Sequence, residues 1–261
     1  MNILLTNDDG VFAEGISCLA KALKKEHNLL IVAPDTQRSG AAHSFTMYVP
    51  LRCKRVELKG LEDVPAYAVS GTPVDCVKLA YGNFDFDIDL VISGINDGEN
   101  RGTDVFYSGT VSAAVEAVLL GIPAIAASNI SSNCKYGDDT AEVIRQIVGK
   151  LIETGISKNM LLNINVPDLP ISSLKGMKIT KLSAQTYENI FDERIDMRGG
   201  KYYWLPSGKT TVCGENDDND ERWANEGYAT ITPLVPDLTD YKSMGYYKDI
   251  LGDSLKWIEL R

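Results

Sequence analysis

The chain has 261 residues, of which 44% are hydrophobic and 24% charged, a composition typical of a globular protein and unlike that of disordered or fibrous chains. It carries 26 Lys and Arg against 36 Asp and Glu, a formal net charge of −10. This balance argues against sequence-independent binding to duplex nucleic acid, because that affinity comes mainly from basic side chains at phosphates. A bound metal ion can reverse the electrostatic field locally, so the negative net charge does not exclude small anionic substrates.

The cysteines and the apolar segments indicate the compartment. The five cysteines are widely spaced and form no C-x-x-C pair, which predicts a reducing compartment and no zinc framework. The first residues contain no basic region and only a short apolar run, so we expect no secretory signal. The longest apolar stretch, 117–127, contains Gly121 and Pro123 and is too short to cross a bilayer. We expect a cytoplasmic protein with no membrane association and no stable nucleic-acid complex.

Short apolar runs alternate with amphipathic stretches through the first two thirds of the chain, the order typical of a parallel sheet covered by helices on both faces. The predicted elements, in chain order, are a strand over 2–6, a helix over 15–25, a strand over 29–33, a helix from Pro73, a strand over 90–93 that ends at Gly94, a helix capped by Ser108 or Thr110, a strand over 124–127, a helix over 140–152, and strands over 161–166 and 228–232.

Two further expectations concern helix packing and the last third of the chain. The helix after Ser108 is predicted to bury one stripe, formed by Val111, Ala114, Val115, Val118 and Leu119. Residues 184–226 are polar, with Tyr202 to Trp204 as a strand fragment and the acidic run 215–221 as a solvated loop. A loop this long is usually functional or an arm that pairs with another subunit. We therefore divide the chain into a core, 1–183, and a C-terminal arm, 184–261, with one strand returning to the core.

The strongest local motif is the run from Thr6 to Gly10 (TNDDG), directly after the first predicted strand. In open α/β sheets the ligand crevice lies at the carboxyl ends of the strands, so Asp8 and Asp9 are expected there. Hard divalent ions such as Mg²⁺ and Mn²⁺ take carboxylate and other oxygen ligands. The alternative is an ordinary turn, because Asn, Asp and Gly favour turns for local reasons.

A second motif, residues 93–102, follows another predicted buried strand. Its glycines allow backbone N–H groups to approach an anion, and Asn96 offers a neutral oxygen ligand. The connection continues to the helix start at Ser108, Gly109 and Thr110, where free amides and the helix dipole favour phosphate. The alternative is a glycine-rich connection that binds nothing.

A third motif, residues 33–44, follows the second predicted strand and therefore reaches the same edge of the sheet. Ser39 can supply a hydroxyl ligand, Arg38 a positive charge for phosphate or carboxylate, and His43 a general acid or base. A single histidine in a loop is more often structural than catalytic, so His43 is only a possible acid or base.

Together these motifs resemble the SurE (survival protein E) family of 5'/3'-nucleotidases. The segments that carry the resemblance are 6–10, 34–44, 70–77 (SGTPVDCV), 93–102 and 107–111, followed by 227–239, which is similar to the family's C-terminal strand. The match spans nearly the whole chain in order, and five spaced motifs together are specific.

The resemblance implies a Rossmann-like α/β fold, a mostly parallel sheet flanked by helices, with a C-terminal arm exchanged between subunits of a homodimer or homotetramer. It implies a metal-dependent phosphomonoesterase that hydrolyses nucleoside 5'- and 3'-monophosphates to nucleoside and phosphate. One divalent ion per subunit, Mg²⁺ or Mn²⁺, would be held by Asp8, Asp9, Ser39 and Asn96, and the two aspartates would be catalytic. The residues implied to line the phosphate site are Gly40, Asn100, Ser108, Gly109 and Thr110.

Two routes for the chemistry stay open. In one, water activated by the ion attacks phosphorus while the groups near 108–110 hold the equatorial oxygens. In the other, Asp8 is the nucleophile and forms an aspartyl-phosphate. Two other classes of function compete: a non-catalytic nucleotide-binding regulator that uses the same crevice, and a scaffold that acts through 202–204 and 241–247. The convergence of three strand-end loops with oxygen ligands favours the enzyme.

Overall fold

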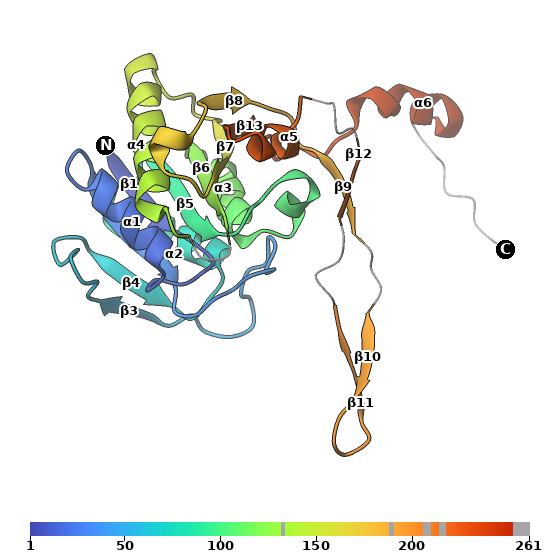
Figure 1. Ribbon diagram of the computed structural model, residues 1–261, viewed down its shortest axis with the longest axis horizontal. Coiled ribbons are helices and arrows are strands. Elements are labelled where there is room, and N and C mark those ends of the chain that lie inside the picture. The colour runs from blue at the N-terminus through green and yellow to red at the C-terminus, as the bar shows by residue number, and fades with distance from the viewer. Residues whose placement is uncertain (132–133, 188–190, 206–209, 214–217, 253–261) are drawn as a thin grey trace.

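The computed structural model describes residues 1–131, 134–187, 191–205, 210–213 and 218–252 (Figure 1). Within these residues the body is a nine-stranded mixed sheet with the strand order β3-β4-β2-β1-β5-β6-β7-β13-β8. Its strands are β1 (Asn2–Thr6), β2 (Asn28–Pro34), β3 (Cys53–Val56), β4 (Ala66–Val69), β5 (Leu90–Asp97), β6 (Ala124–Ile130), β7 (Leu161–Pro167), β8 (Met177–Ile179) and β13 (Ala229–Pro233).

The centre of the sheet is parallel, which confirms the predicted α/β class. Strand β1 lies between β2 and β5 and runs parallel to both, and β5, β6 and β7 continue in the same direction. Antiparallel pairing occurs toward the two edges, where β3 pairs with β4 and β13 with β7. The edge strands β3 and β8, with the short strand β4, were not predicted from the sequence, since they are only three or four residues long.

Helices cover both faces of the sheet because β1 alternates its side chains between them. Ile3 and Leu5 face the cluster that contains the apolar sides of α1 (Glu14–Leu23) and α4 (Gly137–Thr154). Leu4 faces the opposite cluster, which contains the apolar sides of α2 and α3. These two helices are α2 (Pro73–Asn83) and α3 (Gly109–Leu119). No described helix is both long and apolar enough to span a bilayer.

The prediction of one buried apolar stripe on α3 was wrong at the C-terminal end of the helix. Leu119 is 60% exposed, whereas Ala113 and Ala117 are fully buried. The alanines face the cluster around Leu4, where their small side chains allow the helix to approach the sheet closely. Glu116, which interrupts the apolar pattern, is also buried, and it pairs there with His43 and Lys78.

After Ser183 the described residues form a ribbon of two short antiparallel strand pairs, where the sequence predicted a loop with one strand fragment. Strand β9 (Ala184–Tyr187) pairs antiparallel with β12 (Thr210–Cys213), and β10 (Asp192–Ile195) with β11 (Lys201–Trp204). Figure 1 shows this ribbon projecting away from the body. The predicted fragment 202–204 lies in β11.

The acidic run 215–221 was predicted as a solvated loop, and the structure corrects this for its last residues. Helix α5 (Asp220–Asn225) begins here, capped by Asn219, whose side chain accepts a hydrogen bond from the Arg222 amide. Asp220 is fully buried and Asn219 nearly so. Residues 214–217 lie outside the described part of the chain. The last helix, α6 (Tyr241–Leu251), has no buried residue along its described length and stands apart from the sheet (Figure 1).

Candidate active site

Three strand-end loops begin side by side at one edge of the sheet, as predicted. The parallel register places Leu5 of β1 beside Ile31 of β2, and Thr6 of β1 beside Ser93 of β5. Because parallel strands present their carboxyl ends at the same edge, the segments that follow β1, β2 and β5 share one crevice.

The loop after β1 is a turn built by Asn7 and Gly10. The Asn7 amide Nδ2 donates to the Gly10 carbonyl at 2.9 Å, and its Oδ1 accepts from the Gly10 N–H at 3.2 Å. Gly10 has φ of +103°, a conformation that favours glycine. The local turn and a metal site are therefore compatible. The hydrogen bonds of the turn involve only Asn7 and Gly10, so both aspartate side chains can contact other partners.

Asp8 is buried between this turn and the start of α3. Its Oδ1 accepts a hydrogen bond from the Thr110 hydroxyl, and a β-carbon placed on Gly109 would lie 3.0 Å from its Oδ2. Its backbone carbonyl accepts from the Arg38 amide of the second loop at 2.7 Å. Burial, reinforced by the negative charge of Asp9, raises the pKa of Asp8 to about 6 despite the hydrogen bond from Thr110.

Asp9 connects the first loop with the other two. Its Oδ2 accepts from the Asp97 amide at 3.0 Å. Burial and the charge of Asp97 raise the pKa of Asp9, while hydrogen bonds from the Asp97 amide and the Gln37 side chain lower it less. Gln37 also donates to the Ser39 hydroxyl oxygen at 3.0 Å. A cavity of about 200 Å³ beside Asp9 is lined by Ala13, Glu14, Gly15, Gln37, Asp97 and Cys134.

Strand β5 runs to Asp97, beyond the end at Gly94 that the sequence predicted. Its pairing with β6 shifts register between Ser93 and Asn96, and Gly94 has φ of +138°. A β-carbon on Gly94 would lie 2.2 Å from the Ala127 carbonyl oxygen, so only glycine fits there. After the irregularity β5 pairs again with β6, at Asn96 and Asp97, and the Asp97 amide reaches Asp9.

Ser39 and Asn96 complete the predicted metal ligands. Ser39 is exposed beside the crevice, and its oxygen has Gln37 as a donor. The Asn96 amide Nδ2 donates to the Gly98 carbonyl at 2.8 Å, which leaves the amide oxygen as the atom that can face a cation. Backbone hydrogen bonds of the neighbouring residues Arg38 and Asp97 link these positions to the two aspartates.

The chemistry of this donor set fits one hard divalent cation. Across the described ranges, no Lys, Arg or His forms an ion pair with Asp8 or Asp9, so two adjacent acids share a poorly solvated crevice without a protein counter-charge. Among the described residues, no group of three or more His, Cys, Asp and Glu side chains is placed to hold a metal. A site here would therefore combine two carboxylates with neutral hydroxyl and amide oxygens, donors that suit Mg²⁺ or Mn²⁺.

The first turn of α3 forms the phosphate-binding candidate. Ser108 is the N-cap, since its hydroxyl oxygen accepts from the Val111 amide at 3.0 Å, which decides between the two caps that the sequence allowed. The Val111 N–H donates to Ser108 and the Thr110 N–H to Asp8, and the helix dipole makes this helix start favourable for an anion. Gly109 and Thr110 both touch Asp8, so this turn and the acidic pair lie together.

Asn100 faces the interior of the protein. Its Nδ2 donates to Ser128 at 2.8 Å and its backbone amide donates to Asn165 Oδ1 at 2.8 Å. Its carbonyl accepts from the side chains of Asn163 and Asn165 at 2.7 and 3.1 Å. Asn100 therefore anchors the loop after β5 to the ends of β6 and β7, and its contact with phosphate stays a prediction.

Gly40 and His43 belong to the loop after β2. Gly40 has φ of +72° and no atom lies within 4 Å of a β-carbon placed on it, so it borders open space. His43 Nε2 lies 2.8 Å from Oε2 of the buried Glu116, whose Oε1 accepts from Lys78 at 2.9 Å. The Ala42 amide donates to the Tyr107 carbonyl at 3.1 Å, which holds this loop against the start of α3.

Sequence reasoning missed several residues of this arrangement. Gln37 and Asp97 act on Asp9, and Glu116 and Lys78 hold His43. A glutamate within the apolar stretch of α3 is a pattern that could have indicated a buried ion pair. The contribution of Asp97 could not have been found, because its backbone amide makes the contact.

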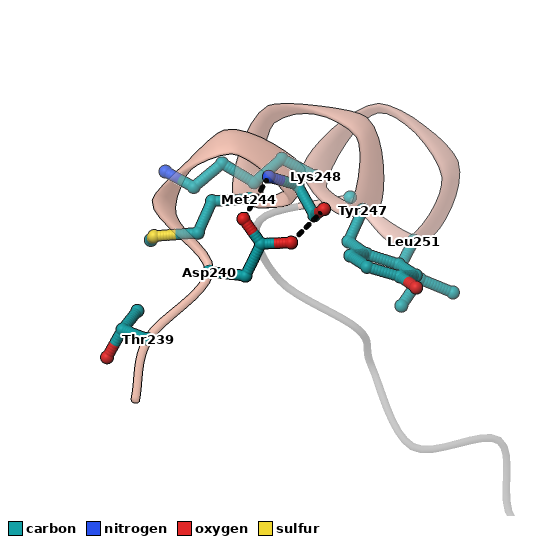
Figure 2. A pocket seen from close by; sticks show the side chains of 8 residues that line it. Thr239, Asp240, Met244, Tyr247, Lys248 and Leu251 are labelled. Atoms are coloured by element: carbon teal, nitrogen blue, oxygen red, sulfur yellow. Dashed lines mark hydrogen bonds between the residues drawn. The ribbon is translucent and has the colours of Figure 1, made fainter. Parts of the chain in front are cut away.

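A larger pocket lies elsewhere and does not belong to this site. Figure 2 shows it along α6. Its volume is about 630 Å³, and all of its lining residues lie within 239–252. Asp240 caps the helix there by accepting from the amides of Lys242 and Ser243 at 3.1 and 3.3 Å. None of the sequence-predicted site residues lines this pocket.

Comparison with known proteins points to one family. The family model described as survival protein SurE matches residues 3–189. A protein of Syntrophomonas wolfei named 5'-nucleotidase SurE is 44% identical over 267 residues, which cover 97% of this chain and 98% of that protein. A protein of Petrotoga mobilis with the same name is 40% identical over 263 residues and covers 100% of both chains. The crystal structure of the SurE protein from Aquifex aeolicus matches with a TM-score of 0.79 and 37% identity, over 96% of this chain and 99% of that one.

Proposed function

Because this chain belongs to the SurE family, we propose that it is a 5'-nucleotidase that hydrolyses nucleoside 5'-monophosphates to nucleoside and phosphate. The observation that carries the proposal is the contact of Asp8 with the first turn of α3. It places a pair of carboxylates beside a helix start that favours phosphate, the two features that hydrolysis of a dianionic ester requires.

The metal dependence is part of this proposal. Asp8, Asp9, Ser39 and Asn96 would hold one Mg²⁺ or Mn²⁺ ion per subunit. When bound, such an ion neutralises the charge on the transferring phosphoryl group and lowers the pKa of bound water. Within the part of the chain that the structure describes, the two aspartates have no basic partner, and the donor set contains oxygen alone; both observations support this assignment.

The chain's own residues would orient the ester. The amides at the start of α3 would hold the equatorial phosphate oxygens, and the Thr110 hydroxyl would fix the orientation of the Asp8 carboxylate. The Gln37 side chain and the Asp97 amide would do the same for Asp9. His43 contacts Glu116, which lies seven residues after Gly109 on α3, so we assign His43 to the side of the leaving nucleoside.

For the displacement itself we propose direct attack by water on phosphorus, in line with the leaving oxygen. Attack by Asp8 is the competing route. Stopping the first turnover with acid and analysing the enzyme by mass spectrometry separates them. Direct attack predicts an unmodified peptide around Asp8, and accumulation of a phosphorylated Asp8 peptide would establish the other route.

We extend the proposal to 3'-monophosphates, to a cytoplasmic enzyme and to self-association through an arm formed by residues 184–261. Gly40 borders open space, which supports acceptance of both ester positions. The arm exposes large apolar side chains, including Trp204 at 59% and Tyr246 at 63% exposed, which supports contact with another subunit as a homodimer or homotetramer. Light scattering measures the assembly directly.

The test of the function is phosphate release from a panel of nucleoside 5'- and 3'-monophosphates, with nucleotide binding measured in parallel by calorimetry. The proposal predicts release from 5'-monophosphates at a rate that saturates with substrate. Binding without release from any nucleotide would instead favour a regulator that uses the same crevice.

A further inference from the structure

The buried carboxylate of Asp220 links the loop after β5 to the base of the projecting ribbon, where Ser183 precedes β9 and α5 follows β12. Asp220 is fully buried at the start of α5, and its Oδ2 accepts from the Gly102 amide at 2.8 Å. Its Oδ1 accepts from the Ser183 amide at 2.8 Å and from the Glu221 amide at 2.9 Å. One side chain therefore bonds the loop after β5, the residue before β9 and the helix that follows β12.

A buried cation makes a second link between the same two segments. Arg101 is 4% exposed, and its guanidinium pairs with Glu99 of its own loop. Its other terminal nitrogen pairs with Glu221 Oε2 at 3.1 Å and contacts Asn225 Oδ1 at 3.3 Å. Because α5 supplies these partners, the loop after β5 is attached to α5 by two independent charged groups.

These links act on the segment that leads into the candidate phosphate site. Gly102 begins a 3₁₀ helix (Gly102–Phe106) that ends two residues before Ser108, the N-cap of α3. Asn100, on the other side of Arg101, is fixed to β6 and β7. The loop is therefore anchored at one end to the sheet and in the middle to α5, and its far end sets the first turn of α3.

We propose that Asp220 and Arg101 are positioning residues for the phosphate site, and that they couple its geometry to the ribbon of β9 to β12. This inference rests on the proposed phosphatase function. Neither side chain touches the reacting atoms. They act by holding Gly102, and through it Ser108 and the amides of α3, at one fixed position relative to Asp8. A displacement of the ribbon base would then reach the phosphate site.

The carboxylate chemistry gives a selective variant. In Asp220→Asn one of the two oxygens becomes an NH₂ group, which cannot accept a hydrogen bond. Either the bond from Gly102 or the bonds from Ser183 and Glu221 are then lost, and N–H donors face each other. Arg101→Gln is the second variant, because it removes both ion pairs while keeping the bond from Gly102 to Asp220.

A matched control is available at the tip of the ribbon. The exposed Asp196 Oδ1 accepts from the amides of Arg198 and Gly200 at 2.7 and 2.9 Å. Asp196→Asn therefore perturbs a carboxylate with the same kind of partners in the same ribbon, without touching the base.

The experiment combines two measurements on the full chain with Mg²⁺: amide hydrogen exchange of the peptide that covers 99–107, and calorimetric affinity for inorganic phosphate. We expect Asp220→Asn to speed exchange of this peptide and to weaken phosphate binding about tenfold, with exchange in α4 unchanged. Arg101→Gln should act in the same direction, and Asp196→Asn should change neither quantity. In nucleotide hydrolysis, KM should rise more than kcat falls.

Unchanged exchange and unchanged phosphate affinity in Arg101→Gln and in a folded Asp220→Asn would overturn the inference. An equal effect of Asp196→Asn would also overturn it, because any loosening of the ribbon would then suffice. If the wild type binds phosphate but hydrolyses no nucleotide, the proposed function fails, while exchange and phosphate affinity still decide whether the two residues set the site.

Discussion

Gly109 at the start of α3 lies directly against the side chain of Asp8. A β-carbon placed on Gly109 would come within 2.8 Å of the Asp8 Cβ and 3.2 Å of its Cγ, distances at which atoms must move. The absence of a side chain at position 109 therefore allows the helix start and the acidic pair to share one crevice.

Gly109→Ala tests this contact. We expect the added methyl group to displace Asp8 from the first turn of α3 and to lower kcat/KM by about 100-fold, the cost typical of a misplacement near 1 Å. Steady-state kinetics with a nucleoside 5'-monophosphate measures it. Gly149→Ala in α4 is the control, since no atom lies within 4 Å of its added carbon. That variant should keep full activity and gain about 0.5–1 kcal/mol of stability.

Thr110 should control the affinity of the metal site through its hydrogen bond to Asp8. Thr110→Val keeps the shape of the side chain but removes the donor, and we expect metal affinity to fall about 10–100-fold, as is typical when a partner of a metal ligand is lost. Thr110→Ser keeps the hydroxyl and should retain most of the affinity. Calorimetric titration with Mn²⁺ measures both variants, and equal affinities in the valine and serine variants would contradict the assignment.

Glu116 should make stability depend on pH. Burial raises the pKa of Glu116, but the hydrogen bonds from His43 and Lys78 outweigh burial, and the net pKa lies below its usual value. The unfolded chain therefore takes up the proton first as the pH falls, so stabilisation by Glu116 is complete above its unfolded pKa of about 4.3 and is lost below it. We expect Glu116→Gln to cost about 1.5–3 kcal/mol at pH 7.

Urea unfolding at pH 7 and pH 4 measures this effect, and the difference between wild type and Glu116→Gln should narrow at the lower pH. The control is Glu153→Gln, which breaks an exposed pair with Lys150 and should cost no more than about 0.5 kcal/mol. A difference that stays constant with pH would show that the charge of Glu116 is not what stabilises α3 and the loop that carries His43.

The central strands could be predicted because their residues are apolar on both faces. The run from Leu90 to Ile92 is fully buried, and such runs indicate a strand that is covered by helices on both sides. Strands β9 to β12 lack that pattern, since they form a two-stranded ribbon outside the core. All residues of β10 and β11, for example, are exposed, so these strands have no buried face that would give an alternating pattern of apolar residues.

The parts of the candidate site that are formed by side chains could be predicted from the sequence. The parts that are formed by backbone groups could not. Asp8 and Asp9 follow an apolar strand, and the sequence places them at its end. The amide of Asp97 and the extension of β5 depend on the close fit of Gly94 against Ala127, which no local pattern expresses. Asp220 lies in an acidic run that resembles a solvated loop, and its burial follows from contacts with residues more than 100 positions away, such as Gly102.

We propose that Asp8, Asp9 and their neutral oxygen partners support metal-dependent release of phosphate from nucleotides. The most direct measurement is phosphate release from a nucleoside 5'-monophosphate after EDTA treatment and after addition of Mg²⁺ or Mn²⁺, in wild type, Asp8→Asn and Asn96→Ala. Asp63→Asn, which breaks an exposed pair with Lys24, is the control. We predict release that EDTA abolishes and either metal restores, with both site variants reduced at least 100-fold and Asp63→Asn unchanged. Release that persists in EDTA, or full activity of Asp8→Asn, would contradict a metal-dependent site at Asp8 and Asp9.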